Sequence, residues 1–552
     1  MRSETCDVLV VGAGAAGLTA AATSSGLSTL IIEKNNLVGG TTALSGGTIW
    51  IPGNPVAKAS GTNDGDSAKQ YLDATTGDTT TNQDALSSSR RNMFLSKGPE
   101  MVSFMVEQGF RWSQSPSKFP DYHPNLPGAQ PSGGRTLNPS VFDAMSLGDW
   151  CGHLKTPGDT PFVTKFEDLR IITRPRASLQ DILKNWWIRL KEKWYRFSLH
   201  TPVSMGLSLT AQLLHICHSH GNVRLYTKTR LVKLVIKNGT VAGAILDQAG
   251  SEVQVHTKRG VLLTTAGYSR NQKLRYEHIG KSTNSEWSLT NPRGDNGIAL
   301  RVGKSIDAGT SHLDKVWGIP TMRDPLTGAT TSAMFELAKP HSVLVNRFGV
   351  RYLCESQPYG SIVDSMMRHG RFNRSWLILD QNYRNKYAIG SLQPWTDSEC
   401  AVSAHRLFRA HNIIELAKQI GLNHEALQHT IEQWNDMCKI GRDFYYKRGA
   451  DEYQQFIGDP SMGPNPNMGP IQTGPFYAIE VYAGDAGTRG GLLTDSYARV
   501  LRKDGEVIPG LYAAGNAAAS IITGESPGAG ATLGPAMTFA YIAANHMMSG
   551  KS

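Results

Sequence analysis

Cysteine is scarce in this sequence, and its spacing argues against a disulfide framework. Six cysteines are spread over 552 residues, and no two of them form a CxxC pair. A small secreted domain that depends on disulfides would carry a denser and more regular cysteine pattern. We therefore expect an intracellular protein with reduced thiols.

The sequence also lacks a long uninterrupted hydrophobic run. No apolar stretch reaches the roughly 18 residues that a membrane-spanning helix requires. The first residues lead almost at once into an apolar strand-like segment, so we expect no cleaved signal peptide. We expect a cytoplasmic protein, and peripheral contact with a membrane stays open as an alternative.

Nucleic-acid-binding motifs are missing as well, although the formal net charge is +10. The sequence contains no zinc-finger spacing, no aromatic RNA-binding signature and no dense tract of lysine and arginine. A basic protein without such features has no evident means of recognising nucleic acid. We predict no nucleic-acid partner.

Glycine, by contrast, is abundant, with 57 residues, and part of it forms a nucleotide-binding turn. The apolar strand 7–11 is followed by the spacing GxGxxG, then by a helix-like segment and a second strand that ends in an acid. The glycines allow a tight turn, close approach of a pyrophosphate and helix packing, and the acid can accept hydrogen bonds from ribose. The cofactor-binding residues predicted here are Gly12, Gly14, Ala15, Ala16, Gly17, Glu33 and Lys34.

Further glycine clusters indicate that the cofactor is FAD. A cluster of glycines and hydroxyl residues at 39–47 suits a long cofactor, and the strand 510–514 leads to a glycine-rich turn that opens a helix near 533. The N-terminus of that helix can stabilise negative charge on a reduced flavin. The additional cofactor-binding residues predicted are Gly40, Thr41, Thr42, Ser45, Gly46, Gly47, Ala266, Gly267, Gly515, Asn516, Thr532 and Leu533.

The order of these elements predicts an α/β protein with two domains. Residues 1–314 and 487–552 form a Rossmann-like FAD-binding domain, in which a parallel sheet is covered by helices and extended by a β-meander. An alternating pattern that turns at Asn238–Gly239 predicts a hairpin within it. Residues 315–486 lack nucleotide-binding motifs and are expected to form an inserted α+β cap that covers the substrate.

The motifs GAGAAG, GGTTALSGG, RGVLLTTAGY and GLYAAGN resemble the fumarate reductase and succinate dehydrogenase flavoprotein superfamily over essentially the full chain. Fumarate reductases carry an arginine proton donor where this sequence has Tyr359. The histidine that tethers FAD covalently in succinate dehydrogenases has no match in TTALSGG. The comparison therefore implies non-covalent FAD and argues against dicarboxylate chemistry.

Within that superfamily the sequence resembles the 3-ketosteroid Δ1-dehydrogenases. The shared motifs are KFPDYHP with Tyr122, ESQPYG with Tyr359, GPFYA, and SPGAGATLGPAM with Gly530. The resemblance implies that Tyr359, assisted by Tyr122, removes the C2 proton beside a C3 ketone while flavin N5 accepts the C1 hydride. The implied donors to the ketone oxygen are the Gly530 N–H and the residue at position 526.

Ser526 departs from the family, which has a tyrosine at this position. The change points to a differently seated or bulkier ketone, such as a steroid-like triterpenoid of the fusidane or helvolic acid type. Weaker enolisation and Δ4-dehydrogenation are the other open interpretations. A flavin-dependent ene-reductase running in the reverse direction and a non-catalytic flavin- or ligand-binding module also stay open. The sequence does not identify the electron acceptor, for which a quinone and oxygen are both open.

Two further segments attract attention. Residues 178–199 show apolar residues at helical spacing, four of them tryptophan or phenylalanine, with lysine and arginine between them. This pattern is typical of a helix that packs on the core, forms a dimer contact or lies at a membrane surface. The histidines of HICHSHG, residues 215–221, lie at the end of a helical pattern, where the dipole favours them, and we predict no metal site.

Overall fold

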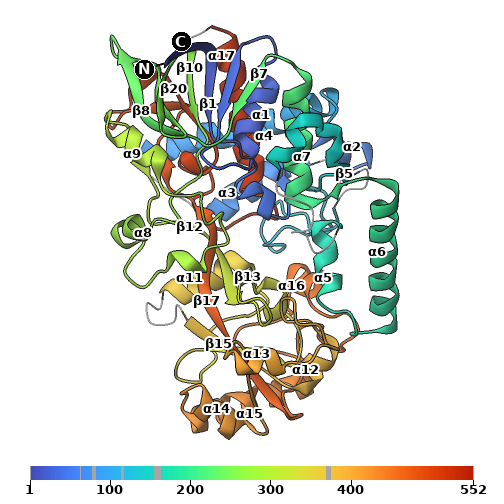
Figure 1. The fold of residues 1–552 in the computed structure, drawn as a ribbon. Helices are drawn as coiled ribbons and strands as arrows, with labels where there is room; N and C mark the ends of the chain where they lie inside the picture. Colours follow the sequence, from blue (N-terminus) through green and yellow to red (C-terminus); the bar gives the residue numbers. More distant parts are fainter. Residues whose placement is uncertain are drawn as a thin grey trace.

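The first strand of the chain lies in the middle of an eight-stranded sheet (Figure 1). The computed structural model describes residues 2–62, 64–76, 82–113, 117–154, 163–368 and 374–550. Strand β1 (Arg2–Val11) is flanked by β2 (Thr29–Ile32) and β10 (Ser251–Leu263), both parallel to it. The apolar ends of these strands are buried on both faces, as expected of a covered parallel sheet.

The remaining strands of this sheet come from distant parts of the chain. The spatial order is β19–β20–β10–β1–β2–β7, and β9 joins β10 and pairs with β8. Their bounds are β7 (Val223–Tyr226), β8 (Thr229–Lys237), β9 (Thr240–Gln248), β19 (Arg499–Leu501) and β20 (Val507–Ala513). The hairpin of β8 and β9 turns at Asn238 and Gly239, whose φ angles are +51° and +77°, so the predicted hairpin is confirmed.

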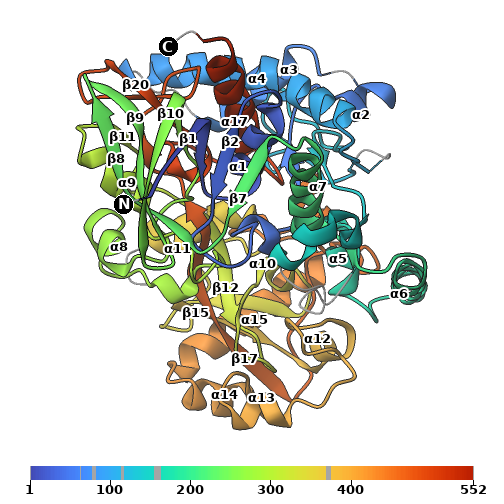
Figure 2. The same ribbon diagram turned by 45° about the horizontal axis from the view of Figure 1, so that its top comes forward.

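Helices cover the sheet and bring the two ends of the chain together. In both ribbon views α1 and α17 lie side by side against the strands, with α4 and α7 beside them (Figures 1 and 2). The bounds are α1 (Ala15–Thr23), α3 (Ser67–Thr76), α4 (Asn82–Glu107), α7 (Met205–Ser219), α9 (Ile298–Lys304) and α17 (Leu533–Met548). The helix that follows the N-terminal turn and the C-terminal helix therefore pack together on one sheet.

The cap has a sheet of its own below the first one (Figure 1). Its strands are antiparallel and run in the order β13–β12–β17–β15–β14, with β16 also paired to β17. The strands are β12 (Val316–Arg323), β13 (Thr330–Ser332), β14 (Ser342–Val345), β15 (Arg374–Leu379), β16 (Phe408–Ala410) and β17 (Phe476–Thr488). The helices are α10 (Met334–Leu337), α11 (Tyr359–Arg368), α12 (Gln381–Lys386), α13 (Glu399–Ser403), α14 (Ile413–Gln419), α15 (His424–Ile440) and α16 (Glu452–Ile457).

In the structure, the sheet of the cap extends from the start of β12 to the end of β17. Strand β12 begins one residue after the predicted start, and β17 continues two residues past the predicted end. Because β17 runs without a break from the cap toward the FAD-binding domain, the last residues of this strand lie between the two domains (Figure 1).

Residues 178–199, which the sequence analysis includes in the FAD-binding domain, lie beside the cap instead. Helices α5 (Leu169–Ile172) and α6 (Leu179–Ser198) lie beside the cap, and α6 stands apart from the rest of the molecule in both views (Figures 1 and 2). The Ala388 N–H donates to Thr173 O at 3.0 Å, and the Ser461 hydroxyl donates to Ala177 O at 3.2 Å. Hydrogen bonds between residues far apart in the sequence therefore attach this insert to the cap.

None of the helices in the described ranges is both long and apolar enough to cross a membrane. The histidines of residues 215–221 lie at the end of α7, where His220 Nε2 is 3.0 Å from Gln108 Oε1.

Candidate active site

A cavity of about 1800 Å³ lies between the sheet and the cap. On one side it is lined at the carboxyl ends of the parallel strands, by Val11, Glu33, Thr264 and Ala514. Ligands of open α/β sheets bind along this edge. On the other side the cavity is lined by cap residues from β12, β13 and α10. The cavity therefore joins a nucleotide-binding edge to a space under the cap.

The GxGxxG glycines form the turn that the sequence predicts. Gly12 has a φ of +110°, and a Cβ there would lie 2.6 Å from the carbonyl oxygen of Thr264. A Cβ on Gly17 would lie 1.9 Å from the carbonyl oxygen of Gly12, so the helix approaches the strand as closely as glycine allows. Gly14 faces the cavity at the N-terminus of α1 and has no side chain to cap it, although the Thr42 hydroxyl accepts from the Ala15 N–H at 3.1 Å. This helix end can therefore receive a phosphate.

Glu33 lies buried at the end of β2 and faces the same turn. Its Oε2 accepts from the Ala13 N–H at 3.1 Å, and its Oε1 accepts from Asn35 Nδ2 at 2.9 Å. The carboxylate lines the cavity, as a ligand to ribose hydroxyls must. Lys34 beside it also lines the cavity, and burial lowers the pKa of its ammonium group.

Asp295 is a cavity residue that the sequence interpretation missed. Its Oδ2 accepts from the Thr41 hydroxyl at 3.0 Å, and its Oδ1 accepts from the Gly267 N–H at 3.1 Å. Burial raises the pKa of this carboxyl to about 6. The available signal was the turn RGDNG in front of an apolar helix, a second glycine-rich turn before a helix. Gly267 does not line the cavity itself and instead helps to hold Asp295.

The opposite end of the cofactor site is formed by the C-terminal segment. The N-terminus of α17 has no side-chain cap, and its first residues line the cavity. Asn516 Oδ1 accepts from Trp317 Nε1 at 3.2 Å, which fixes the turn after β20. The predicted cofactor-binding residues that line the cavity are Gly12, Gly14, Ala15, Ala16, Glu33, Lys34, Gly40, Thr41, Thr42, Ser45, Gly46, Gly47, Ala266, Gly515, Asn516, Thr532 and Leu533. This continuous wall, from a phosphate-binding helix end to a second helix end, fits FAD.

Two tyrosine hydroxyls meet in the cavity. The Tyr122 hydroxyl donates to the Tyr359 hydroxyl at 3.0 Å, and the rings pack edge to face with centroids 5.2 Å apart. Burial raises the pKa of both phenols, and that of Tyr122 lies well above its ordinary value. Because Tyr122 donates the hydrogen bond, it favours the ionised form of Tyr359. The pair therefore has one phenol suited to act as base and one suited to support it.

Arg489 supplies positive potential near Tyr359, and the sequence interpretation missed this residue too. Its charge opposes the effect of burial and lowers the pKa of Tyr359. The guanidinium is buried, donates to Gly524 O and lies 4.4 Å from the ring centroid of Trp317. Tyr359 is also the first residue of α11, where the helix dipole favours negative charge. No local pattern links Arg489 to Tyr359, since 129 positions separate them.

A buried ion network fixes the loop that carries Tyr122. Asp121 accepts from Trp50 Nε1 at 2.9 Å and from Arg135 Nη1 at 2.7 Å. Arg135 Nε in turn donates to Asp64 at 2.8 Å. The adjacent carboxylate is thus held from two directions, and the Tyr122 ring has little freedom to leave the cavity.

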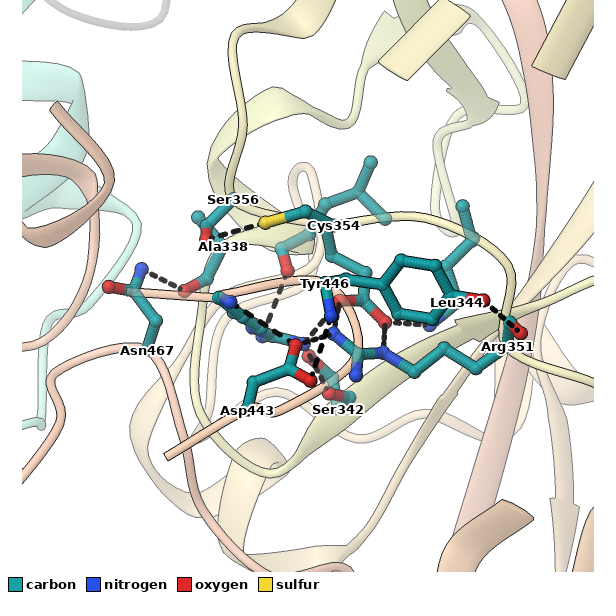
Figure 3. A network of polar contacts seen from close by, with 12 residues as sticks. Ala338, Ser342, Leu344, Arg351, Cys354, Ser356, Asp443, Tyr446 and Asn467 are labelled. Atoms are coloured by element: carbon teal, nitrogen blue, oxygen red, sulfur yellow. Dashed lines mark hydrogen bonds and ion pairs between the residues drawn. The ribbon is translucent and has the colours of Figure 1, made fainter. Parts of the chain in front are cut away.

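A second network fixes the loop that leads to Tyr359 (Figure 3). Arg351 donates to both oxygens of Glu355, at 2.8 and 2.7 Å, and to Asp443 at 2.6 Å. Burial raises the pKa of Glu355, but the charges of Arg351 and Arg448 outweigh it and keep the pKa below its ordinary value. All of these side chains are buried, so the loop from Arg351 to Tyr359 is fixed at its base.

Gly530 lies in the cavity wall at a position that only glycine can occupy. Its φ is +97°, and a Cβ would lie 2.6 Å from backbone atoms of Ile49 and Thr48. Its carbonyl oxygen accepts from the Trp50 N–H at 3.1 Å, and no acceptor for its own N–H is found among the described residues. This N–H is therefore available to a ligand.

Ser526 does not line the cavity, in contrast to the expectation that it contacts the substrate ketone. It is 5% exposed, and the carbonyl of the next residue, Pro527, accepts from the Tyr122 N–H at 3.0 Å and from the Tyr71 hydroxyl at 2.7 Å. A serine side chain ends several ångströms short of where a tyrosine hydroxyl would reach. The site therefore brings together Tyr122, Tyr359 and Gly530 but leaves Ser526 outside.

Comparisons with known proteins agree with this geometry. The protein-family model described as FAD binding domain matches residues 7–533. The 3-oxosteroid 1-dehydrogenase of Mycolicibacterium smegmatis is 34% identical, over 99% of this chain and 97% of that protein. The 4-oxocyclohexanecarboxylate 2-dehydrogenase of Sinomonas cyclohexanicum is 32% identical, over 98% of this chain and 92% of that protein.

A solved structure agrees over the whole fold. The crystal structure of 3-ketosteroid delta1-dehydrogenase from Sterolibacterium denitrificans, in complex with 1,4-androstadiene-3,17-dione, matches with a TM-score of 0.89. The two sequences are 34% identical, and the match covers 99% of this chain and 100% of that one. The predictions of FAD as cofactor, of the fold and of the resemblance to these dehydrogenases are confirmed. The chain therefore belongs to the 3-oxosteroid 1-dehydrogenase family and is an FAD-dependent oxidoreductase.

Proposed function

We propose that the protein introduces a C1–C2 double bond beside the C3 ketone of a steroid or steroid-like triterpenoid. The observation that carries this proposal is the pair of tyrosine hydroxyls, 3.0 Å apart, in the cavity that also contains the FAD-binding glycines. A saturated C1–C2 bond next to a ketone loses a proton from C2 and a hydride from C1. FAD, bound without a covalent link, supplies the acceptor for that hydride.

Residues of the chain then accept the proton and stabilise the negative charge that develops on the ketone oxygen. Tyr359 takes the C2 proton onto its phenolate oxygen, and the C2–H electron pair moves toward the C3 carbonyl. The Gly530 N–H donates to the ketone oxygen as this negative charge grows, a type of contact worth about 3–4 kcal/mol in the transition state. Tyr122 donates to Tyr359 and so stabilises the phenolate form that acts as the base.

The walls around the tyrosines suit a rigid apolar substrate. The side chains there are mainly aromatic and aliphatic: Phe166, Leu169, Leu289, Ile319, Met334 and Phe335. Burying a polycyclic skeleton against such walls gains roughly 25 cal/mol for each Å² of apolar surface. Because Ser526 is outside the cavity, the space that the tyrosine of other family members would occupy can admit a bulkier ring system.

The proposal is tested by mixing the oxidised holoenzyme anaerobically with 3-keto steroids and steroid-like triterpenoid ketones. We expect at least one ketone with a saturated C1–C2 bond to bleach the flavin absorbance rapidly and to yield the corresponding C1–C2 alkene. Reoxidation by oxygen or by a soluble quinone then identifies the acceptor. If no ketone bleaches the flavin but an enone reoxidises pre-reduced enzyme, the protein is a reductase.

We further propose that helix α6 docks the protein on an anionic membrane surface. Only Asp181 and Asn185 of this helix are buried. Asn185 Nδ2 donates to Ile171 O of α5 at 3.0 Å, and Asp181 forms an ion pair at 3.2 Å with Arg174, which lies just after α5. The apolar side chains left exposed are Leu179, Ile182, Leu183, Trp186, Trp187, Leu190, Trp194 and Phe197. Among the described residues, none of these side chains belongs to a hydrophobic cluster of the core or the cap.

The charges and the position of α6 favour a lipid surface as its partner. Five cationic side chains accompany the apolar ones: Lys184, Arg189, Lys191, Lys193 and Arg196. Tryptophan and cationic residues on one amphipathic helix suit the headgroup region of an anionic bilayer. Arg189 and Leu169 both line the cavity, so this docking would bring its opening close to a membrane-dissolved substrate.

For the double variant Trp186→Ser/Trp187→Ser we expect about a tenfold loss of binding to vesicles of phosphatidylcholine and phosphatidylserine in a flotation assay. Binding of the parent should weaken with added salt, because the attraction to the anionic lipid is screened. The matched control is Trp395→Ser, which removes an equally exposed tryptophan elsewhere on the cap. Equal flotation of parent and double variant, or dimerisation through α6 without vesicles, would contradict the proposal.

A further inference from the structure

The cap contributes a buried carboxyl group to the cavity that the proposed reaction does not use. Glu336 lies in the short helix α10, is 4% exposed and lines the same cavity as Tyr359. Its Oε1 accepts from the Gly390 N–H at 3.2 Å. The backbone N–H of Glu336 itself also favours the ionised form of the carboxyl group, and no side chain in the described part of the chain donates to it. A carboxyl group at such depth is costly unless its second oxygen also has a partner.

Asp324, which lines the same cavity, has hydrogen-bond donors to both of its carboxylate oxygens. Its Oδ1 accepts from the Ser391 hydroxyl at 2.6 Å and from the Thr327 N–H at 2.9 Å, and its Oδ2 accepts from the Ser391 N–H at 2.7 Å. Burial raises the pKa of Asp324, but these hydrogen bonds outweigh it and keep the pKa below its ordinary value. Asp324 therefore holds two turns together, whereas Glu336 retains capacity for a ligand.

Burial and the neighbouring charges place the pKa of Glu336 near neutral pH. Burial raises its pKa to about 7, although Lys339 lowers it, and Asp324 adds to the increase. Lys339 is itself fully buried, donates to Ile457 O at 2.5 Å and has a pKa well below its ordinary value because of burial and the charge of Arg174. From α12, the Tyr383 hydroxyl donates to the backbone carbonyl of Glu336 at 3.1 Å. Glu336 is thus not neutralised by a dedicated cation.

We propose that Glu336 binds a hydroxyl group of the substrate, remote from the reacting ketone. This inference rests on the proposed function for the placement of the ketone beside Tyr359 and Gly530. The aromatic and aliphatic side chains described above offer no hydrogen bond to such an oxygen. Polar cap residues such as Thr331 and Gln393 also line the cavity, and among them Glu336 offers a buried carboxyl group. Specificity for an oxygenated polycyclic substrate over its deoxygenated analogue follows, because the analogue would leave the buried carboxyl without a partner.

The hydroxyl group suits both protonation states of Glu336. A hydroxyl donates to the carboxylate and can accept from the carboxylic acid, whereas a ketone can only accept and so requires the acid. Preference for a hydroxyl over a ketone at the same ring position should therefore increase as the pH rises through about 7. A purely structural carboxyl would produce no such change.

The test measures ligand affinity and does not depend on turnover. The probes are androsta-1,4-dien-3-ones, which already contain the C1–C2 double bond, carrying a hydroxyl, a ketone or no oxygen at C11 or C17. Their dissociation constants are measured from the perturbation of the flavin spectrum of oxidised holoenzyme. We expect at least one hydroxyl to improve binding about tenfold over the unsubstituted compound.

Three variants separate recognition from structure. Glu336→Gln keeps an acceptor for the Gly390 N–H, so a substrate hydroxyl should still improve binding. Because the amide does not titrate, the preference for a hydroxyl over a ketone should no longer change with pH. Glu336→Leu should lose the advantage altogether. Asp324→Asn, a carboxyl-to-amide change at the same wall, should lower stability, keep the hydroxyl advantage and move its pH dependence to lower pH, because the charge of Asp324 raises the pKa of Glu336. If no hydroxyl preference depends on Glu336, or if Glu336→Gln keeps the pH dependence, the inference is wrong.

The outcome is distinguishable from failure of the proposed reaction. A hydroxyl preference that depends on Glu336, in a protein that dehydrogenates none of the ketones, would support the binding site and reject the reaction. Dehydrogenation without any such preference would support the reaction and reject this role for Glu336.

Discussion

Replacement of Tyr359 by phenylalanine is expected to slow anaerobic flavin reduction by a 3-keto substrate about 1000-fold. The substitution removes the oxygen that receives the C2 proton and leaves the ring that packs on Tyr122. Ligand affinity, measured from the flavin spectrum with a product-like dienone, should change less than about threefold, because the cavity walls are unaltered. Rapid-mixing absorbance measures the rate, and a spectral titration measures the affinity.

Two further variants serve as controls for the loss of rate in Tyr359→Phe. Tyr387→Phe removes a hydroxyl from another buried tyrosine of the cap, which donates to Asp459 at 2.6 Å and lies outside the cavity. It should reduce thermal stability and leave the rate of flavin reduction unchanged. Tyr122→Phe should give an intermediate effect, since it removes a supporting hydrogen bond and not the base. Rapid reduction that survives in Tyr359→Phe would assign the proton transfer to another group.

Removal of the charge at position 489 is expected to move the pH dependence of catalysis toward alkaline pH. In Arg489→Gln the positive charge that lowers the pKa of Tyr359 is absent, so that pKa rises further. The rate depends on ionised Tyr359 and increases with pH up to this pKa, so the rising limb of the kcat/KM profile shifts upward in pH. At pH 7 we expect kcat/KM to fall about 10- to 100-fold, since the ionised fraction drops tenfold for each unit of pKa.

Arg489→Lys is the matched variant for this experiment. It retains a positive charge and should recover most of the rate at pH 7, although lysine cannot reproduce the contacts of a guanidinium with Trp317 and Gly524. FAD content and thermal unfolding of each variant report whether the fold is intact. A kcat/KM profile of Arg489→Gln with an unshifted rising limb would show that Arg489 does not act on the proton transfer.

The cofactor site was predictable because it is built from local signals. A strand, a glycine turn and a helix follow one another within about twenty residues, and their spacing alone requires a close approach of backbone to phosphate. The structure places 17 of the 19 predicted cofactor-binding residues in the cavity wall. Gly17 and Gly267 act behind it, through helix packing and through the hydrogen bond to Asp295.

The substrate side depended much more on tertiary contacts. Ser526 has the sequence position of a substrate contact, but its short side chain does not reach the cavity. Glu336 carries no motif, and only the folding of the cap places it in the cavity wall. Helix α6 was recognisable as amphipathic, yet the sequence could not decide whether its apolar face would be buried, because burial depends on which distant segments pack against it.

By itself the sequence determined the FAD-binding fold, since its glycine motifs are contiguous and their geometry is fixed by backbone conformation and short-range packing. The two catalytic tyrosines and the limits of the inserted cap stay predictions of the sequence. Only the tertiary structure decided that Tyr122 lies 3.0 Å from Tyr359 and that Arg489 acts on the same phenol. It alone decided that Glu336 shares their cavity. Electrostatic influence and burial depend on distance in space, and residues more than a hundred positions apart acquire that distance only when the chain folds.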